Sequence, residues 1–193
     1  MSRSYSANKG FTLIEVIVVL AVVGILAAIM TPMITRYIDD AREARAKNDA
    51  LIIGSGILAL IKDAGRMPGD YAASGVKRLI GPGDQATGSG DAAAWGTGTT
   101  ESLDDHLLAN NPGGGTDYKT SGEFRWRGPY LESIKEDPWG NAYVVNAEYL
   151  KKTDKTNAVY VLSAGPDGVF QTVYTQSIEG PELGGDDIGY RIK

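Results

Sequence analysis

The hydrophobic positions begin with one nearly unbroken apolar run. Residues 11–33 read FTLIEVIVVLAVVGILAAIMTPM, and Glu15 is the one charged residue among them. A helix of this length, at about 1.5 Å per residue, spans the roughly 30 Å hydrocarbon core of a bilayer. Arg3 and Lys9 precede the run, so the positive-inside rule predicts a single-pass segment with its N-terminal end in the cytoplasm.

After the apolar run the pattern takes on helical spacing. Between residues 34 and 64, apolar residues recur every three or four positions with charged residues between them, which predicts an amphipathic continuation of the same helix. This second half is expected to pack on a folded domain. Gly54 and Gly56 would let another element approach it closely, and Gly65 is expected to end it.

Residues 65–124 are rich in glycine and polar residues. The stretch from 65 to 122 holds 13 of the 25 glycines, and we interpret 65–124 as a variable loop region. Ser102 to Leu108 is the exception, because it is a predicted short helix with Ser102 as its N-cap. His106, the one histidine of the chain, is assigned to the solvated face of that helix.

Apolar and β-branched residues return in the C-terminal part, residues 125–193. Ala142–Val145 and Ala158–Leu162 are predicted strands, and Val169–Tyr174 is a candidate third strand. The run Asp137-Pro138-Trp139-Gly140-Asn141 is turn chemistry that leads into the first of these strands. The chain therefore ends in a β-rich region.

Charge and composition narrow the range of functions. The residues after 33 carry 17 Lys and Arg against 23 Asp and Glu, and this acidic balance offers no general footprint for nucleic acid. The lack of cysteine excludes disulfides, thiolate metal sites and a cysteine nucleophile. With a single histidine, no Ser/His/Asp order and no His-x-x-x-His pair, no enzymatic activity is predicted.

Three interpretations of the apolar run compete. A secretory signal peptide needs a shorter apolar core followed by small residues, and here Ala27-Ala28 lies inside the run. A plain membrane anchor explains the length and orientation but not Glu15, because a carboxylate at membrane depth costs about 2.5–3.5 kcal/mol. The third interpretation rests on Lys9-Gly10-Phe11-Thr12-Leu13-Ile14-Glu15, which resembles the type III signal of type IV prepilins and of the pseudopilins of type II secretion.

This resemblance implies a role for three residues. Residues 1–10 would be a leader that a prepilin peptidase removes after Gly10, Phe11 would then be N-methylated, and Glu15 would act in methylation and assembly. The helix of residues 11–33 would be both membrane anchor and polymerisation segment. In a filament Glu15 could pair with the Phe11 ammonium of a neighbouring subunit, so that each buried charge has a partner. Alternatively, Glu15 lies near the membrane surface and reaches water.

An ordered series of motifs in the C-terminal part resembles the major pseudopilin of type II secretion and its pilin-like relatives. The series consists of Trp126–Leu131, Asp137–Asn141, Ser163–Gly168 and Asp186–Gly189. The resemblance implies an α+β pilin fold, in which the long N-terminal helix packs on a small antiparallel sheet with long loops. It leaves residues 66–124 with little clear counterpart.

The same resemblance implies calcium in the C-terminal loop. Asp167 and Asp187 would supply carboxylates, and the carbonyls of Ala164 and Val169 would be among the remaining ligands. Ca²⁺ takes about six to eight oxygens from such loops, and one ion would fasten the C-terminus of a protein without disulfides. The loop between the two aspartates is longer than the family pattern, and the usual Asn-Trp ending is replaced by Ile192-Lys193. Alternatively, both aspartates cap turns.

The two resemblances lead to one functional hypothesis and two alternatives. The leading hypothesis is the structural subunit of a periplasmic pseudopilus. This helical homopolymer would grow from the bacterial inner membrane and drive type II protein secretion together with minor pseudopilins and a secretion platform. The first alternative is a type IV pilin in an extracellular surface fibre for adhesion, motility or DNA uptake. The second is a solitary membrane-anchored ligand-binding module.

Overall fold

The computed structural model describes residues 10–70, 75–114 and 117–193. The chain divides into two compact units, Met1–Ala41 and Arg42–Lys193. Apart from Gly10, the expected leader lies outside the described residues, and so do Arg3 and Lys9, on which the predicted membrane orientation rests.

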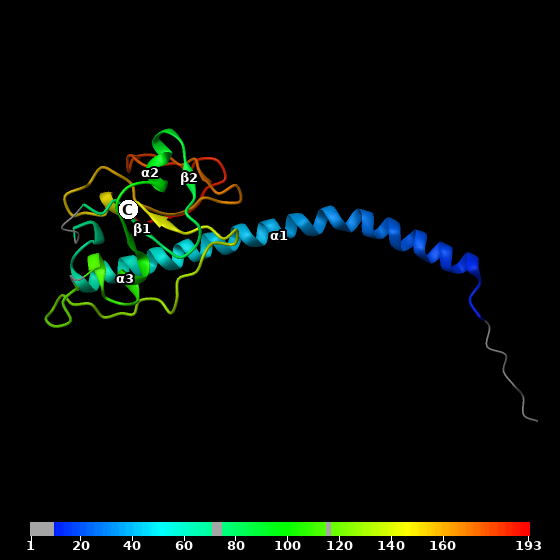
Figure 1. Ribbon diagram of the computed structural model, residues 1–193, viewed down its shortest axis with the longest axis horizontal. Helices are drawn as coiled ribbons and strands as arrows, with labels where there is room; N and C mark the ends of the chain where they lie inside the picture. The colour runs from blue at the N-terminus through cyan, green and yellow to red at the C-terminus, as the bar shows by residue number, and fades with distance from the viewer. Residues whose placement is uncertain (1–9, 71–74, 115–116) are drawn as a thin grey trace, which may run out of the picture. The chain divides into compact units, whose positions relative to one another are not determined.

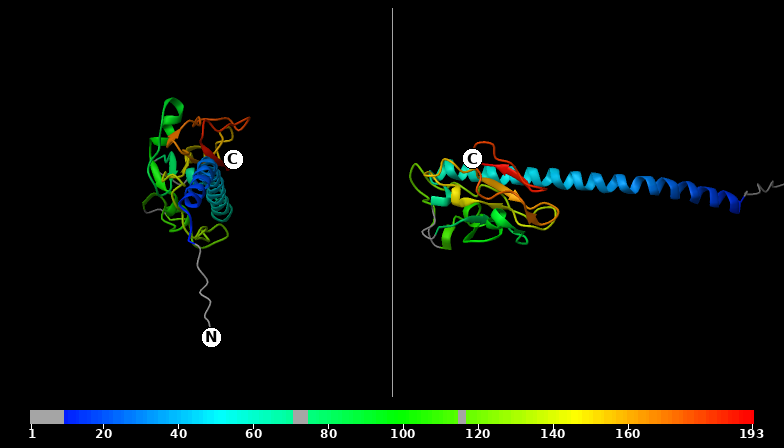
Figure 2. Two further views of the ribbon diagram at one scale, coloured as in Figure 1. Left: turned by 90° about the vertical axis from the view of Figure 1, so that its right-hand side faces the viewer. Right: turned by 90° about the horizontal axis from the view of Figure 1, so that it is seen from above.

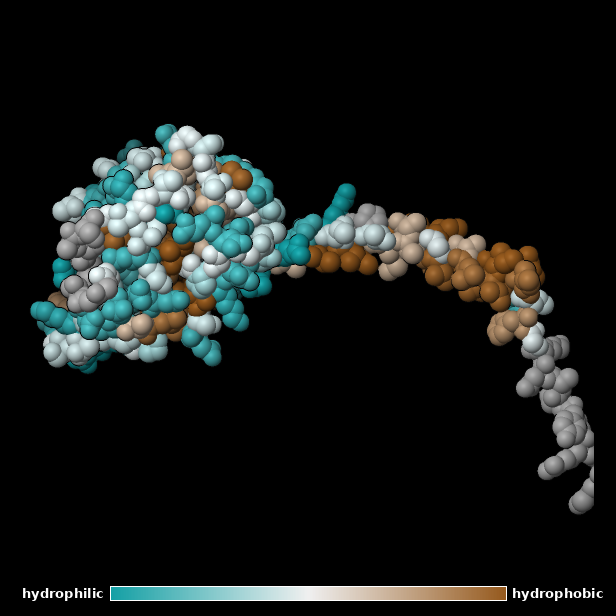
Figure 3. Space-filling view, in the orientation of Figure 1, coloured by the Kyte–Doolittle hydropathy of each residue, from teal (hydrophilic) through white to brown (hydrophobic). Residues whose placement is uncertain are grey.

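One long helix, α1 (Leu13–Ala64), contains both the continuous apolar run and the amphipathic segment that follows it, as predicted. In the first unit the large apolar side chains from Phe11 to Ile38 are exposed, and Figure 3 shows this surface in brown. By length and composition, part of α1 is long and apolar enough to cross a membrane.

In the second unit α1 ends at the predicted glycine. Gly65 has a φ of 65°, which favours glycine, and its amide donates to the Ile61 carbonyl at 3.0 Å. Gly54 lies so close to the Tyr190 ring that a Cβ at this position would clash with it. Gly56 likewise faces a neighbouring side chain. The prediction that these two glycines allow close approach is therefore confirmed.

Five strands of the second unit form a mixed sheet in the order β3-β1-β4-β5-β7. Their bounds are β1 Arg78–Ile80, β3 Thr100–Ser102, β4 Val144–Val145, β5 Tyr160–Ser163 and β7 Ile188–Arg191. β1 and β3 are parallel, whereas the other neighbouring pairs are antiparallel. β5 and β7 pair over four residues, with Tyr160 opposite Arg191 and Ser163 opposite Ile188. A separate parallel pair consists of β2 (Thr87–Gly88) and β6 (Val169–Phe170).

Short helices connect these strands. They are α2 Ala93–Gly96, α3 Leu103–Leu107, and the single turns η1 Pro68–Asp70, η2 Gly90–Ala92, η3 Pro112–Gly114 and η4 Ala147–Tyr149. The predicted short helix is confirmed as α3, and the Ser102 hydroxyl accepts a hydrogen bond from the Asp104 amide at 3.1 Å as its N-cap. Figure 1 shows α3 beside the end of α1 and α2 beside β2.

The sheet has an apolar core on each of its two faces. Side chains alternate along a strand, so Val145 and Val161 face one core while Val144 and Leu162 face the other. The second half of α1 completes the first core through Ala50, Ile53, Ile57 and Leu60. Figure 2 shows the strands between α1 and the segment that contains α2. The fold is α+β, with a long N-terminal helix and a small sheet.

The second core corrects the interpretation of residues 65–124 as a loop region. This segment contributes β1, β2, β3, α2 and α3, and Trp95 of α2 is fully buried. The Trp95 indole donates to the Thr172 carbonyl at 2.8 Å and packs edge-on against Tyr174. Elements of two to five residues are too short to show a repeating spacing of apolar residues. The high glycine content of the segment therefore led to its interpretation as a loop region.

The C-terminal strands match the predicted segments more closely. β4 and β6 lie within two of them, and β5 begins inside the third. β5 is buried along its whole length because both sheet faces are covered, and this explains its unbroken apolar pattern. β7 was not predicted, because Gly189 and Arg191 weaken its apolar alternation.

Candidate functional site

The residues predicted for leader cleavage precede α1. Gly10, Phe11 and Thr12 lie before the first helical residue, Leu13, and Phe11 is 85% exposed. A Cβ at Gly10 would meet no atom within 4 Å. The Gly10–Phe11 peptide bond therefore lies in exposed, non-helical backbone, which is the kind of segment that proteases cut.

Glu15 makes a local contact that the sequence analysis missed. Its amide donates to Thr12 Oγ1 at 3.3 Å, and its Oε2 accepts a hydrogen bond from the Thr12 amide at 3.4 Å. This reciprocal pair is a capping box, which satisfies amides at the start of α1. The Thr-x-x-Glu spacing is the signal that could have identified it. Glu15 thus has a local role that an experiment must separate from any role in assembly.

Three of the C-terminal motifs lie together at the end of β5. The buried Asp137 carboxylate accepts hydrogen bonds from two amides of its own turn, at 2.9 and 2.8 Å, and from the Ser163 hydroxyl at 2.5 Å. The Asn141 side chain donates to the Gly165 carbonyl at 3.3 Å. A Cβ at Gly165 would clash with the Asp186 carbonyl. The fold therefore joins the Asp137, Ser163 and Asp186 motifs.

Asp187 is a buried carboxylate with one unpaired oxygen. Its Oδ2 accepts hydrogen bonds from the Gln171 and Thr172 amides at 2.9 and 2.6 Å. Its Oδ1 is buried and has no hydrogen-bond partner among the described residues. Burial raises the pKa of Asp187, although its hydrogen bonds to Thr172 and Gln171 act in the opposite direction.

Asp167 is exposed and already paired. Its Oδ1 accepts a hydrogen bond from the Val169 amide at 2.8 Å, and its Oδ2 accepts one from the Gln171 side chain at 2.6 Å. Gln171, which the sequence did not single out, therefore contacts both of the aspartates that are predicted to bind calcium. Of the two predicted carbonyl ligands, Ala164 is fully buried and Val169 begins β6.

These groups fit a calcium site in part. The unpaired Oδ1 of Asp187 is the kind of buried polar atom that a cation would satisfy. Both carboxylate oxygens of Asp167 accept N–H donors, so this residue would have to share an oxygen with the ion. In the described part of the chain no three acidic, histidine or cysteine residues gather as a metal site. A calcium ion at this site would therefore need backbone carbonyl oxygens among its ligands.

The assignment of His106 to a solvated helix face is wrong. Its side chain is fully buried, with Nδ1 2.7 Å from the Tyr118 hydroxyl and Nε2 2.7 Å from Glu101 Oε2. These partners fit the neutral tautomer in which Nε2 donates to Glu101 and Nδ1 accepts from Tyr118. Glu101 lies on β3, and Tyr118 lies beyond the end of α3, so tertiary contacts that helical spacing does not reveal bury His106.

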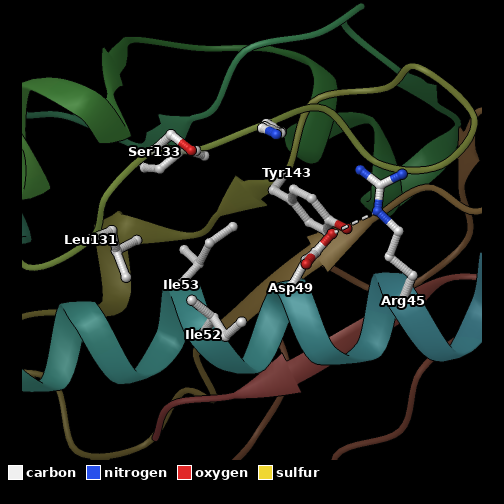
Figure 4. A pocket seen from close by; sticks show the side chains of 9 residues that line it. Arg45, Asp49, Ile52, Ile53, Leu131, Ser133 and Tyr143 are labelled. Carbon is white, nitrogen blue, oxygen red and sulfur yellow. Dashed lines mark hydrogen bonds and ion pairs between the residues drawn. The ribbon is translucent and has the colours of Figure 1, made fainter.

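A cleft of about 440 Å³ lies between α1 and the chain around Leu131 (Figure 4). Arg45 and Asp49 of α1 form an ion pair at its edge, with 3.3 Å between Nε and Oδ2, and the Tyr143 ring extends toward them. Tyr143 is fully buried, and its hydroxyl has no hydrogen-bond partner among the described residues. Burial raises the pKa of Tyr143, and the Asp49 charge raises it further.

Two of the buried tyrosines, Tyr143 and Tyr118, are expected to respond differently when their hydroxyl is removed. We expect Tyr143→Phe to leave the free energy of unfolding unchanged or to raise it, because its hydroxyl is unpaired. Tyr118→Phe should lower it by about 1–3 kcal/mol, because His106 Nδ1 then loses its buried partner. Urea unfolding of the full chain in detergent, followed by tryptophan fluorescence, measures both. Equal losses in the two variants would contradict this account.

Two protein families match the chain. The family described as "Prokaryotic N-terminal methylation motif" matches residues 5–31. The family described as "Type II secretion system (T2SS), protein G" matches residues 108–178. The first match covers the apolar start of α1, and the second runs from the end of α3 through β4, β5 and β6.

Individual relatives include core G proteins of type II secretion systems and a fimbrial protein. The type II secretion system core protein G of Escherichia coli (strain K12) is 25% identical over 170 residues, which cover 88% of this chain and 90% of that protein. The core protein G of Pseudomonas aeruginosa is 28% identical over 161 residues, which cover 83% and 85%. The fimbrial protein EcpC of Eikenella corrodens is 40% identical over 73 residues, which cover 38% of this chain and 48% of EcpC. No solved structure matches the chain.

The long apolar helix, the small sheet and these matches define the chain as a type IV pilin-like protein. Its similarity over most of its length is to core protein G of type II secretion, so within that class it is like the major pseudopilin.

Proposed function

We propose that the chain is the structural subunit of a periplasmic pseudopilus that drives type II protein secretion, and that it assembles after leader removal between Gly10 and Phe11. The observation that carries this proposal is the similarity to two core G proteins over 83–90% of both chains. That similarity extends far beyond the N-terminal methylation motif. The role is structural rather than catalytic, as in the pilin-like class.

The apolar surface of the first unit supports assembly. Its exposed side chains would face lipid while the subunit is in the membrane and would pack on the same segment of other copies in a filament. Glu15 would pair with the Phe11 ammonium that cleavage creates. The capping contacts engage only Oε2 of Glu15, which leaves Oε1 available to that ammonium.

The proposal includes a location and partners. The subunit would be a single-pass protein of the bacterial inner membrane, with its N-terminus cytoplasmic and its folded part periplasmic. A prepilin peptidase would process it, and minor pseudopilins and the secretion platform would contact it. The methylation-motif match and the apolar start of α1 support the membrane location.

A type IV pilin of an extracellular surface fibre is the second candidate. The observation that favours it is the 40% identity to the fimbrial protein EcpC, although this covers only 38% of the chain. In this case the subunit would assemble through the same N-terminal residues, but the filament would extend from the cell surface.

Deletion of the gene followed by complementation separates the two candidates. We expect wild-type protein to restore secretion into the medium, and immunogold imaging to find no long fibres that contain it. The control variant Gly10→Val, which blocks cleavage, should restore neither secretion nor assembly. Normal secretion in the deletion strain together with long labelled fibres in the wild type would contradict the secretion role.

We also propose that calcium binds at the loop that contains Asp167 and Asp187, with the carbonyls of Ala164 and Val169 among its ligands. The unpaired, buried Oδ1 of Asp187 supports this proposal. The ion would supply positive charge there and tie the turn after β5 to the start of β7.

Chelation should therefore lower the melting temperature. A ligand at about 100 times its Kd adds about 2.7 kcal/mol, which corresponds to about 5–10 °C for a chain of this size. We expect EGTA to remove this increment from the wild type and from Asp91→Ala, a control at an exposed aspartate elsewhere. Asp167→Ala should abolish the shift. A wild-type melting curve that does not respond to EGTA or added calcium would exclude the site.

A further inference from the structure

A basic cleft lies at the end of α1. Its cavity has a volume of about 560 Å³, and its rim carries Lys62, Arg66, Lys119 and Lys152. All four side chains are exposed, although the part of the chain after residue 33 is acidic overall. Lys62, Lys119 and Lys152 make no ion pair within the described residues. The cleft is therefore a local cluster of positive charge in a part of the chain whose net charge is negative.

An exposed aromatic ring forms part of this basic cleft. Phe124 is 58% exposed, and a Cβ at Gly65 would lie 2.7 Å from its ring, so the ring rests on the turn that ends α1. Burying such a ring contributes about 25 cal/mol per Å² of apolar surface covered. The cleft thus suits a ligand that has both carboxylates and an apolar side chain.

One segment of the same chain has both exposed carboxylates and an exposed apolar side chain. The acidic loop, residues 173–184 between β6 and β7, exposes Glu179, Glu182 and Leu183. Neither glutamate makes an ion pair within the described residues. The Gln176 side chain accepts from the Glu182 amide at 2.8 Å and donates to the Glu182 carbonyl at 2.7 Å. The loop is therefore held in shape before it meets a partner, which lowers the entropic cost of binding.

We propose that the acidic loop of one copy docks into the basic cleft of a second copy. Glu179 and Glu182 would pair with the lysines of the rim, and Leu183 would cover Phe124. A long polyanion is a poorer occupant, because it would extend over the acidic remainder of the surface. The inference rests on the proposed self-assembly and names the surfaces through which the folded parts meet.

The absence of cysteine allows a direct test in the full-length protein in membranes. Two differently tagged copies are co-expressed, one with Lys119→Cys and the other with Leu183→Cys, and are oxidised. A disulfide forms only when the Cα atoms approach to within about 7 Å. We expect a cross-linked heterodimer at least tenfold above the control in which Asp91→Cys replaces Lys119→Cys.

Charge reversal then tests the ion pairs. Lys62→Glu with Lys152→Glu in the first copy should lower the cross-link about tenfold, and Glu179→Lys with Glu182→Lys in the second copy should restore it. Salt should weaken the wild-type contact, because the screening length falls from about 10 Å at 0.1 M to about 3 Å at 1 M.

Isolation of one copy through the tag on the other measures self-assembly independently. If the copies co-purify but the cross-link stays at the control level, the docking proposal is wrong and self-assembly stands. If they do not co-purify at all, self-assembly itself is wrong, and the docking proposal fails with it.

Discussion

Replacing Glu15 with Gln is expected to abolish filament assembly. Gln at this position keeps the capping box with Thr12, because an amide can also reach the Thr12 backbone. It removes the charge that would pair with the Phe11 ammonium of a neighbour. Removing one partner of a buried ion pair costs about 3–5 kcal/mol, which is more than a hundredfold in the association constant of each contact.

Co-purification of two tagged copies, together with secretion in the complemented deletion strain, measures the loss. Thr12→Ala is the matched control, because it removes the capping hydroxyl and keeps the charge. We expect it to cost about 1 kcal/mol of helix stability while assembly continues. If Thr12→Ala blocks assembly and Glu15→Gln does not, Glu15 acts through the helix cap. If neither variant has an effect, the chain fits the solitary ligand-binding module better.

His106→Ala is expected to be among the most destabilising single changes in the second unit. It leaves the Tyr118 hydroxyl and the Glu101 carboxylate without their shared partner and opens a cavity beside α3. Unpaired buried groups and a cavity together cost about 3–5 kcal/mol. Urea unfolding measures the loss, and Glu123→Ala, at an exposed position of the same region, should stay within about 0.5 kcal/mol of the wild type.

The His106 contribution should also depend on pH. Burial lowers the pKa of His106 below its ordinary value of 6.5, while the hydrogen bond to Glu101 acts in the opposite direction. Below about pH 6.5 the unfolded chain therefore binds more protons than the folded chain, so stability falls as pH falls. The difference between wild type and His106→Ala should be complete above pH 6.5 and should shrink below it. A difference that grows on acidification would show that His106 is charged in the folded protein.

The sequence was sufficient wherever one local signal determined the structure. The apolar run of residues 11–33 and the helical spacing after it predicted α1. In a helix this long, the spacing of apolar residues repeats often enough to be recognised in the sequence. Gly65 and Ser102 predicted a helix end and a helix start through their own backbone and side-chain chemistry. The leader, methylation and calcium residues remain predictions, since they depend on chemistry that the fold does not report.

Only the tertiary structure determined how the glycine-rich segment folds. Trp95 is buried in the second core, where its indole N–H donates to the carbonyl of Thr172, 77 residues later. His106 is buried between its hydrogen-bond partners Glu101 and Tyr118. Strands of two to four residues carry too few side chains to show a period, and their pairing partners are distant in sequence. The sequence alone therefore determined the helix and the class of protein. Long-range contacts determined the second core, the buried histidine and the contacts of Asp187, because burial depends on which distant residues meet.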